Sequence, residues 1–249
     1  MISLSVIYII FIISFKNLKP FILNRINILI LIYSMILTLQ ILLEGYNNLG
    51  LGYEIYGGLI NINIITVFAE IIILISGIIL LTLGEWKINK NLMSVPGEYN
   101  LIILISILGM ITLLISNDLI LLFLSIELLS FPLYILASFY KWNKNRFING
   151  IGINRDNQSS IAAGLKYLYL GALSSSLLLL GCVILYGYTG LTNLSDIALL
   201  IGVGINNTLS YINIMNISYK LILGFILISV ALLFKIGAVP FHNWAPEKE

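Results

Sequence analysis

The chain has 249 residues, of which 59% are hydrophobic and only 10% are charged, whereas about a quarter of the residues of an ordinary soluble domain are charged. This composition excludes a soluble globular protein and indicates a protein that crosses a membrane several times. The formal net charge of +2 gives no indication of nucleic-acid binding. The single cysteine, Cys182, excludes a disulfide within the chain and a multi-cysteine metal or iron–sulfur centre.

Apolar runs of bilayer-spanning length, about 17 to 25 residues, predict seven transmembrane helices. They cover residues 2–15, 26–43, 59–83, 98–116, 119–140, 161–189 and 218–239. The first run has neither a preceding basic region nor an Ala-x-Ala-like cleavage site, so we interpret it as a retained helix and not as a signal peptide. Between the last two runs, Ser195 and Asp196 are possible caps of a short helix that lies at the surface or beside the bundle.

Basic residues divide the predicted connections into two groups. The connections at residues 16–25, 84–97 and 141–160 hold nine Lys and Arg residues, whereas the other three hold none. The positive-inside rule therefore places the basic connections in the cytoplasm or the mitochondrial matrix, and the amino terminus on the opposite side. Lys220 is the one basic residue near that opposite side, where a lysine at a helix end can snorkel to the interface.

Four ionisable residues fall inside the predicted spans: Glu70, Glu127, Lys166 and Lys235. Each costs about 2.5–3.5 kcal/mol when it lies unpaired at the bilayer centre. We therefore expect these side chains to point into the bundle and to pair or to meet water, as in a proton or ion path. His242, just beyond the last apolar run, joins this list because histidine titrates near neutral pH. An interfacial role is its alternative.

Glu127 and Lys235 are the two charges that a helix distortion accompanies. Glu127 precedes Pro132 by five residues, and a proline leaves the carbonyl four residues before it without its helical donor. Lys235 precedes a break formed by Gly237 and Pro240, so we expect its ammonium to take freed carbonyls or to pair with Glu127. The structural alternatives are a helix–helix hydrogen bond for Glu127 and snorkelling for Lys235.

Lys166 and Glu70 are less constrained by their surroundings. Lys166 lies near the start of the sixth predicted span, where snorkelling and a buried position both stay open. A run of small residues follows it, Gly171, Ala172 and Ser174 to Ser176, and such residues favour close helix packing. Glu70 lies in the middle of its span with no partner evident from the sequence, so a functional role and a structural pair both stay open.

Four segments carry a resemblance to a known family. They are Ser-Ile-Glu127-Leu-Leu-Ser-Phe-Pro132 within residues 117–137, Gly164-Leu-Lys166-Tyr-Leu-Tyr-Leu-Gly-Ala-Leu-Ser-Ser, Tyr186-Gly-Tyr-Thr-Gly-Leu-Thr-Asn, and Phe234-Lys235-Ile-Gly-Ala-Val-Pro-Phe-His242-Asn-Trp-Ala-Pro246. The chain resembles the antiporter-like membrane-arm subunits of respiratory complex I over residues 117–246. The earlier helices agree only in being hydrophobic. The interpretation therefore divides the chain into three amino-terminal helices, residues 1–97, and an antiporter-like bundle, residues 98–249.

The resemblance implies an all-α membrane protein whose last span is discontinuous and which forms half of an inverted-repeat bundle. It implies a proton-translocating subunit of NADH:ubiquinone reductase in the mitochondrial inner membrane, with the basic connections in the matrix. Glu127, Lys235 and Lys166 would carry protons, with His242 and Glu70 as further candidates. NADH, FMN, the iron–sulfur clusters and ubiquinone would be bound by other subunits, with no cofactor or metal in this chain. The partners would be other membrane-arm subunits and the bilayer.

One departure from the family concerns the end of the sequence. Family members continue into a second, inverted set of helices, and Glu247-Lys248 stands where they usually have an aspartate. We therefore expect a fragment, a protein whose remainder is a separate polypeptide, or an interrupted gene. Two alternative functions remain: a subunit of a multi-subunit cation/proton antiporter, and a structural membrane scaffold without transport.

Overall fold

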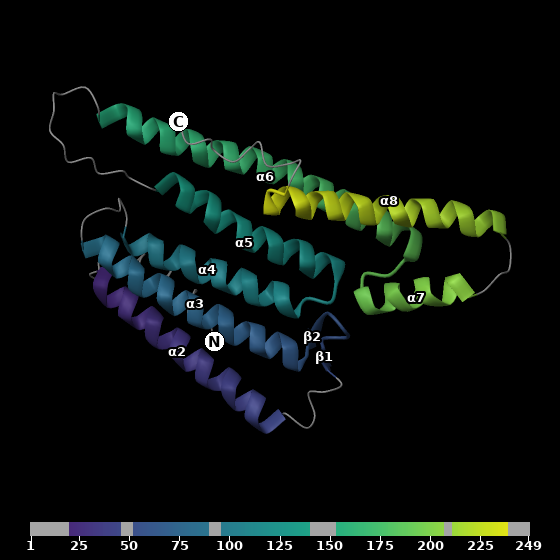
Figure 1. Ribbon diagram of the computed structural model, residues 1–249, viewed down its shortest axis with the longest axis horizontal. Coiled ribbons are helices and arrows are strands. Elements are labelled where there is room, and N and C mark those ends of the chain that lie inside the picture. Colours follow the sequence, from purple (N-terminus) through teal and green to yellow (C-terminus); the bar gives the residue numbers. More distant parts are fainter. Residues whose placement is uncertain (1–19, 46–51, 90–95, 140–152, 207–210, 239–249) are drawn as a thin grey trace. The chain divides into compact units, whose positions relative to one another are not determined.

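The computed structural model describes residues 20–45, 52–89, 96–139, 153–206 and 211–238. This part of the chain contains seven helices and one hairpin (Figure 1): α2 (Pro20–Gly45), β1 (Tyr53–Ile55), β2 (Ile60–Ile62), α3 (Ile64–Asn89), α4 (Pro96–Ile115), α5 (Leu119–Phe139), α6 (Ile153–Thr189), α7 (Leu194–Asn206) and α8 (Tyr211–Ile236). Six of these helices, all except α7, are long and apolar enough to cross a membrane. The predicted all-α membrane fold is confirmed, while the span predicted at residues 2–15 lies outside the described residues.

The described residues form two compact units, each assembled from several segments. Unit 1 contains α2, α3, α4, the part of α5 from Leu128 onward and the part of α6 up to Leu165. Unit 2 contains the turn of the hairpin, the part of α5 up to Glu127, the rest of α6, and α7 and α8. The predicted division of the chain after residue 97 concerns the order of segments along the sequence and stays a prediction.

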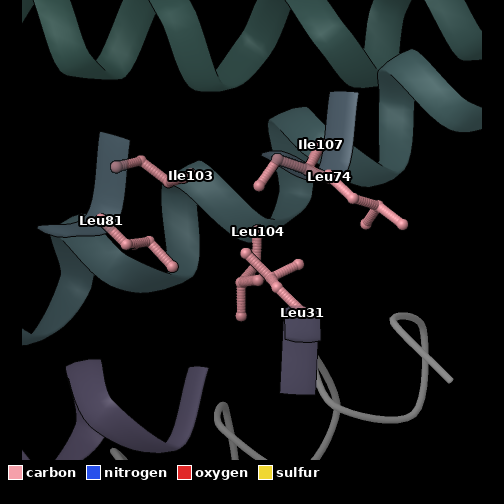
Figure 2. Packing of buried hydrophobic residues seen from close by; sticks show 6 residues of the cluster. All are labelled: Leu31, Leu74, Leu81, Ile103, Leu104 and Ile107. Atoms are coloured by element: carbon pink, nitrogen blue, oxygen red, sulfur yellow. The ribbon is translucent and has the colours of Figure 1, made fainter. Parts of the chain in front are cut away.

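In unit 1, α2, α3 and α4 lie side by side and share one apolar core (Figure 1). Its buried side chains are Leu31 of α2, Leu74 and Leu81 of α3, and Ile103, Leu104 and Ile107 of α4 (Figure 2). The spacing of seven residues within α3, and of three and four residues within α4, places the side chains of each of these helices on one stripe. A glycine brings α3 close to α4, because a Cβ at Gly77 would lie 2.5 Å from Ile107 Cδ1.

In unit 2, α6 and α8 pack against each other through glycines. A Cβ at Gly181 would lie 3.0 Å from the Gly224 carbonyl oxygen and 3.1 Å from the Ile228 nitrogen. The two helices meet a second time where Lys220 Nζ of α8 lies 4.7 Å from the centroid of the Tyr188 ring of α6. Residue numbers therefore fall along α6 as they rise along α8, so the two helices run antiparallel. The ammonium of Lys220 binds an aromatic face in a cation–π contact.

Three connections are joined by hydrogen bonds at one end of unit 2. Asn117 Nδ2 donates to Asn193 Oδ1 at 3.0 Å and to the Gly58 carbonyl at 3.2 Å. The backbone adds bonds from the Asn117 nitrogen to the Leu59 carbonyl and from the Leu194 nitrogen to the Asn117 carbonyl, each 2.9 Å long. The hairpin turn, the α4–α5 turn and the α6–α7 loop therefore hold one another in place. We call Gly58, Asn117 and Asn193 the loop network.

The third predicted helix begins later than expected. Residues 60–62 form β2, and α3 begins only at Ile64. The reason is local backbone chemistry, since Tyr56, Gly57 and Gly58 all have positive φ and turn the chain back on itself. Asn63 then caps α3: its nitrogen donates to Thr66 Oγ1 at 2.9 Å, and that hydroxyl donates to the Asn63 carbonyl at 2.8 Å. The apolar run in the sequence indicates neither the hairpin turn nor this cap.

The predicted short helix between the last two spans is confirmed as α7, but its cap is a different residue. Asn193 Oδ1 accepts hydrogen bonds from the nitrogen and the hydroxyl of Ser195, at 3.2 and 2.9 Å. The cap is therefore Asn193, and Ser195 and Asp196 both lie in the first turn. There the Asp196 carboxylate faces the positive end of the helix dipole.

Replacing Gly58 with Ala is expected to destabilise the loop network more than replacing Gly57 with Ala. Both glycines have positive φ, 90° and 69°, so both substitutions carry backbone strain of about 1–2 kcal/mol. Only at Gly58 would the new Cβ also collide with Asn193 Nδ2, since a Cβ at Gly57 has no atom within 4 Å. Hydrogen exchange of the Asn117 and Leu194 amides measures the difference. Equal exchange rates in the two variants would show that the contact with Asn193 is unimportant.

Candidate functional site

Glu127 and Lys235 form an ion pair inside unit 2. Lys235 Nζ donates to Glu127 Oε1 at 2.9 Å, which is the usual length of a charge-assisted hydrogen bond. The two side chains keep only 15% and 17% of their surface exposed, for Lys235 and Glu127 respectively. The predicted contact between them is confirmed, and their role in proton transfer stays a prediction.

A buried aspartate caps the start of α5 and so determines how far along the helix axis Glu127 lies. Asp118 Oδ1 accepts a hydrogen bond from the Ile120 nitrogen at 2.8 Å, which is the arrangement of a helix N-cap. Asp118 is 2% exposed. Glu127 follows nine residues later, or about 13 Å along the axis at about 1.5 Å per residue. α5 continues through Pro132 to Phe139, so this proline does not end the helix.

The position of Lys235 is set by the end of α8. Gly237 has a φ of 70°; its nitrogen donates to the Phe234 carbonyl at 3.2 Å, and the Ala238 nitrogen donates to the Leu233 carbonyl at 3.1 Å. This pair of bonds is a Schellman motif with glycine at its left-handed position. The helix therefore ends at Ile236 and not at the predicted residue 239. The backbone satisfies these two carbonyls itself, which leaves the ammonium of Lys235 available to Glu127.

Ser174 of α6 lies at the level of the ion pair. Gly181 of α6 contacts Ile228 of α8, and the two helices run antiparallel. Lys235 lies seven residues after Ile228, and Ser174 lies seven residues before Gly181. The contact between α6 and α5 gives the same level. Cys182 Sγ of α6 lies 4.0 Å from the Leu119 carbonyl of α5. Ser174 lies eight residues before Cys182, and Glu127 lies eight residues after Leu119.

The Ser174 side chain is fully buried and donates to the Gly171 carbonyl at 2.7 Å. Its hydroxyl oxygen keeps lone pairs that can accept a hydrogen bond from an ammonium or a water molecule. The sequence indicated only a small packing residue at this position. The missing signal was the register of three helices, which residue spacing within one helix does not contain.

The other predicted site residues do not join this pair. Lys166 belongs to unit 2 but has an exposed side chain. Glu70 belongs to unit 1, where it is half-buried on the stripe of α3 that also carries Val67 and Leu74. His242 lies outside the described residues. Within the described ranges, no group of three or more His, Cys, Asp or Glu residues is placed to hold a metal ion.

The fold and this site define a polytopic membrane protein with a mostly buried ion pair between two membrane-crossing helices. Residues 116–249 match the family described as "NADH:quinone oxidoreductase/Mrp antiporter, TM". The match covers more than half of the chain, and the chain therefore belongs to this family. The family that the sequence resembled is confirmed.

Two relatives align with most of the chain. NADH-ubiquinone oxidoreductase chain 2 of Rhizopus oryzae is 40% identical over 240 residues, which cover 90% of this chain and 41% of the relative. NADH-quinone oxidoreductase subunit N of Wolbachia sp. subsp. Brugia malayi is 35% identical over 224 residues, with the same two coverages of 90% and 41%. The chain thus spans less than half the length of these relatives.

Solved structures share the fold. Respiratory complex I from Thermus thermophilus contains a chain with a TM-score of 0.68 and 22% identity, and the match covers 98% of this chain and 45% of that chain. The Mrp complex from Dietzia sp. contains one with a TM-score of 0.66 and 15% identity, covering 98% and 41%. Identities this low show the fold alone, and that fold is the predicted antiporter-like one.

Proposed function

We propose that this chain is part of a proton-translocating membrane-arm subunit of respiratory complex I. In this role it couples electron transfer from NADH to ubiquinone, which takes place on other subunits, to proton pumping. The observation that carries the proposal is the Glu127–Lys235 ion pair, in a chain that is 40% identical to a complex I chain 2 over 240 residues. NADH, FMN, the iron–sulfur clusters and ubiquinone are bound elsewhere in the complex.

The ion pair supplies two states that differ in charge separation. In the closed state the Lys235 ammonium donates to the Glu127 carboxylate, as in the structure. When a neighbouring charge draws the two apart, each is left at membrane depth without its partner, at a cost of about 2.5–3.5 kcal/mol per charge. Loss of a proton from the ammonium removes one of these costs. Opening the pair therefore favours proton release from Lys235, and closing it favours uptake.

Lys166 is the proposed next station for the proton. It lies on the same helix as Ser174, eight residues away, or about 12 Å along the axis. A hydroxyl and water molecules are needed to cover that distance, because a hydrogen bond spans only about 3 Å. Ser174 supplies a hydroxyl at one end of this path. His242 and Glu70 are the further candidates.

The surroundings of the chain follow from the same proposal. The protein crosses the mitochondrial inner membrane several times, the basic connections 16–25, 84–97 and 141–160 face the matrix, and the amino terminus faces the intermembrane space. Other membrane-arm subunits cover part of its apolar surface, which includes exposed side chains such as Leu43, Ile65 and Ile236, at 78%, 81% and 78%. The isolated chain is not expected to pump.

Affinity purification through a tag on this chain tests the proposal. We expect it to bring down a complex that contains flavin and iron–sulfur clusters, reduces ubiquinone with NADH and pumps protons in vesicles. Sodium-dependent transport by a complex without a flavin or a quinone partner would favour a cation/proton antiporter instead. If charge substitutions in the spans abolish assembly on native gels but never alter transport, the chain is a structural scaffold.

A further inference from the structure

Three asparagine side chains are fully buried in unit 1: Asn24 and Asn27 of α2, and Asn100 of α4. Asn24 Nδ2 donates to the Leu81 carbonyl at 3.1 Å. The remaining polar atoms of the three side chains are Asn24 Oδ1 and both the Oδ1 and the Nδ2 of Asn27 and Asn100, and none of them has a hydrogen-bond partner among the described residues. We call these three side chains the amide layer.

The amide layer lies at one end of the aliphatic core. Asn24 and Asn27 precede Leu31 by seven and four residues, so all three lie on one stripe of α2. Asn100 precedes Leu104 by four residues on α4, and Leu104 packs in the same core as Leu81, which accepts the bond from Asn24 (Figure 2). The layer therefore faces the interior of the three helices.

A second contact gives the level of Asn100. A Cβ at Gly84, one turn beyond Leu81 on α3, would lie 2.6 Å from the ring of Tyr99. Tyr99 immediately precedes Asn100 in the chain. Asn100 is therefore level with the turn of α3 between Leu81 and Gly84, beside the point where Asn24 binds α3. These contacts therefore place the aromatic ring of Tyr99 next to the amide layer.

Unpaired amide atoms in such a place need a ligand. A buried donor or acceptor without a partner loses its hydration and gains nothing in return, and the large majority of buried side-chain polar atoms in proteins are paired. The amide layer presents both acceptors, the Oδ1 atoms, and donors, the Nδ2 atoms of Asn27 and Asn100. A ligand that only donates leaves the two Nδ2 atoms unpaired, and one that only accepts leaves the three Oδ1 atoms unpaired.

Water satisfies both kinds of atom, since one molecule donates two hydrogen bonds and accepts two, and buried water usually makes about three. A metal cation binds the oxygens alone. We infer that the amide layer is a hydrated site, in which internal water molecules bridge Asn24, Asn27 and Asn100 beside the dry aliphatic core.

Radiolytic hydroxyl labelling of the purified complex that contains this chain tests the inference. Radiolysis of a bound water molecule creates a hydroxyl radical in place, so Tyr99 beside the amide layer is modified. We expect the rate of Tyr99 modification, read by mass spectrometry, to fall several-fold when Asn27→Leu and Asn100→Leu are combined. Asn61→Leu is the matched control, because Asn61 Oδ1 is also buried and unpaired but precedes the start of α3 at Ile64, whereas the amide layer lies near the other end of that helix, at Leu81 and Gly84. An unchanged Tyr99 rate in the double variant overturns the inference.

A measurement on the unaltered complex keeps the test independent of whether the variants assemble. The complex is mixed with water that carries a heavy oxygen isotope and is irradiated after short delays. Tyr56, 76% exposed on the hairpin turn, should carry the heavy isotope from the first time point. Tyr99 is partly exposed, so bulk water labels it with the heavy isotope at once, and slowly exchanging internal water should add a light-isotope fraction that fades with the delay. If Tyr99 carries no light-isotope fraction even at the shortest delay, the amide layer holds no internal water.

Discussion

Replacing Glu127 with Gln is expected to lower coupled proton pumping by at least about tenfold, because positioned proton-transfer groups contribute about 100- to 10,000-fold to a rate. The amide keeps the shape of the side chain and a hydrogen-bond acceptor for Lys235 Nζ, now 2.9 Å from Oε1, but it removes the charge that the closed state needs. Assembly should be retained, since the volume at this mostly buried position is unchanged. Pumping in vesicles and native gels of the same membranes measure both effects.

Variants of the two lysines on α8 distinguish the effect of losing the ion pair from the effect of losing any positive charge on this helix. Lys235→Met should lower pumping as Glu127→Gln does, whereas Lys220→Met removes a lysine that contacts the Tyr188 ring and should leave pumping near the parent rate. Because the pair acts as one unit, the double variant should cost little more than either single one, with a coupling of about 0.5–3 kcal/mol. If Glu127→Gln pumps at the parent rate in an assembled complex, the role proposed for the pair is wrong.

Replacing Gly181 with Val is expected to destabilise unit 2 by about 1–3 kcal/mol, the usual cost of overpacking. The new Cβ would meet backbone atoms of α8, at 3.0 Å from the Gly224 carbonyl oxygen and 3.1 Å from the Ile228 nitrogen. Backbone cannot rotate away as a side chain does, so α6 and α8 must separate. The temperature at which the complex dissociates on native gels should fall, and Gly181→Ala should give a smaller shift in the same direction.

Gly187 on the same helix supplies the matched control. A Cβ at Gly187 would have no atom within 4 Å, so Gly187→Ala should bring a small gain, at most the roughly 0.5–1 kcal/mol of a helix interior, because Gly187 lies in the last turn of α6. Opposite signs at the two glycines would show that the effect comes from the α6–α8 contact. A Gly181→Val complex as heat-stable as the parent would mean that the two helices do not need this close approach.

Much of the fold was predictable because, in a bilayer, the hydrophobicity of a segment is nearly enough to identify it as a membrane-crossing helix. Six of the seven predicted spans correspond to α2 to α6 and α8, because a membrane segment must satisfy its backbone polar groups internally and must be apolar over its whole length. The errors fell where this constraint ends. Residues 60–62 became a strand, and α8 ended at Ile236, because Gly58 and Gly237 adopt positive φ. Backbone conformation at such glycines depends on contacts that an apolar run does not record.

By itself the sequence determined the class of protein, the membrane-crossing helices, and the four ionisable residues within the predicted spans, because charge at membrane depth is costly wherever the helix lies. It left two partners open for Lys235, the freed carbonyls and Glu127. The tertiary structure decided between them, since it places Lys235 Nζ 2.9 Å from Glu127 Oε1. It also placed Ser174 at the level of the pair along the helix axes and gathered Asn24, Asn27 and Asn100 in one layer. These contacts depend on the register between helices, and that register is set by close approaches at glycines such as Gly181 and Gly84.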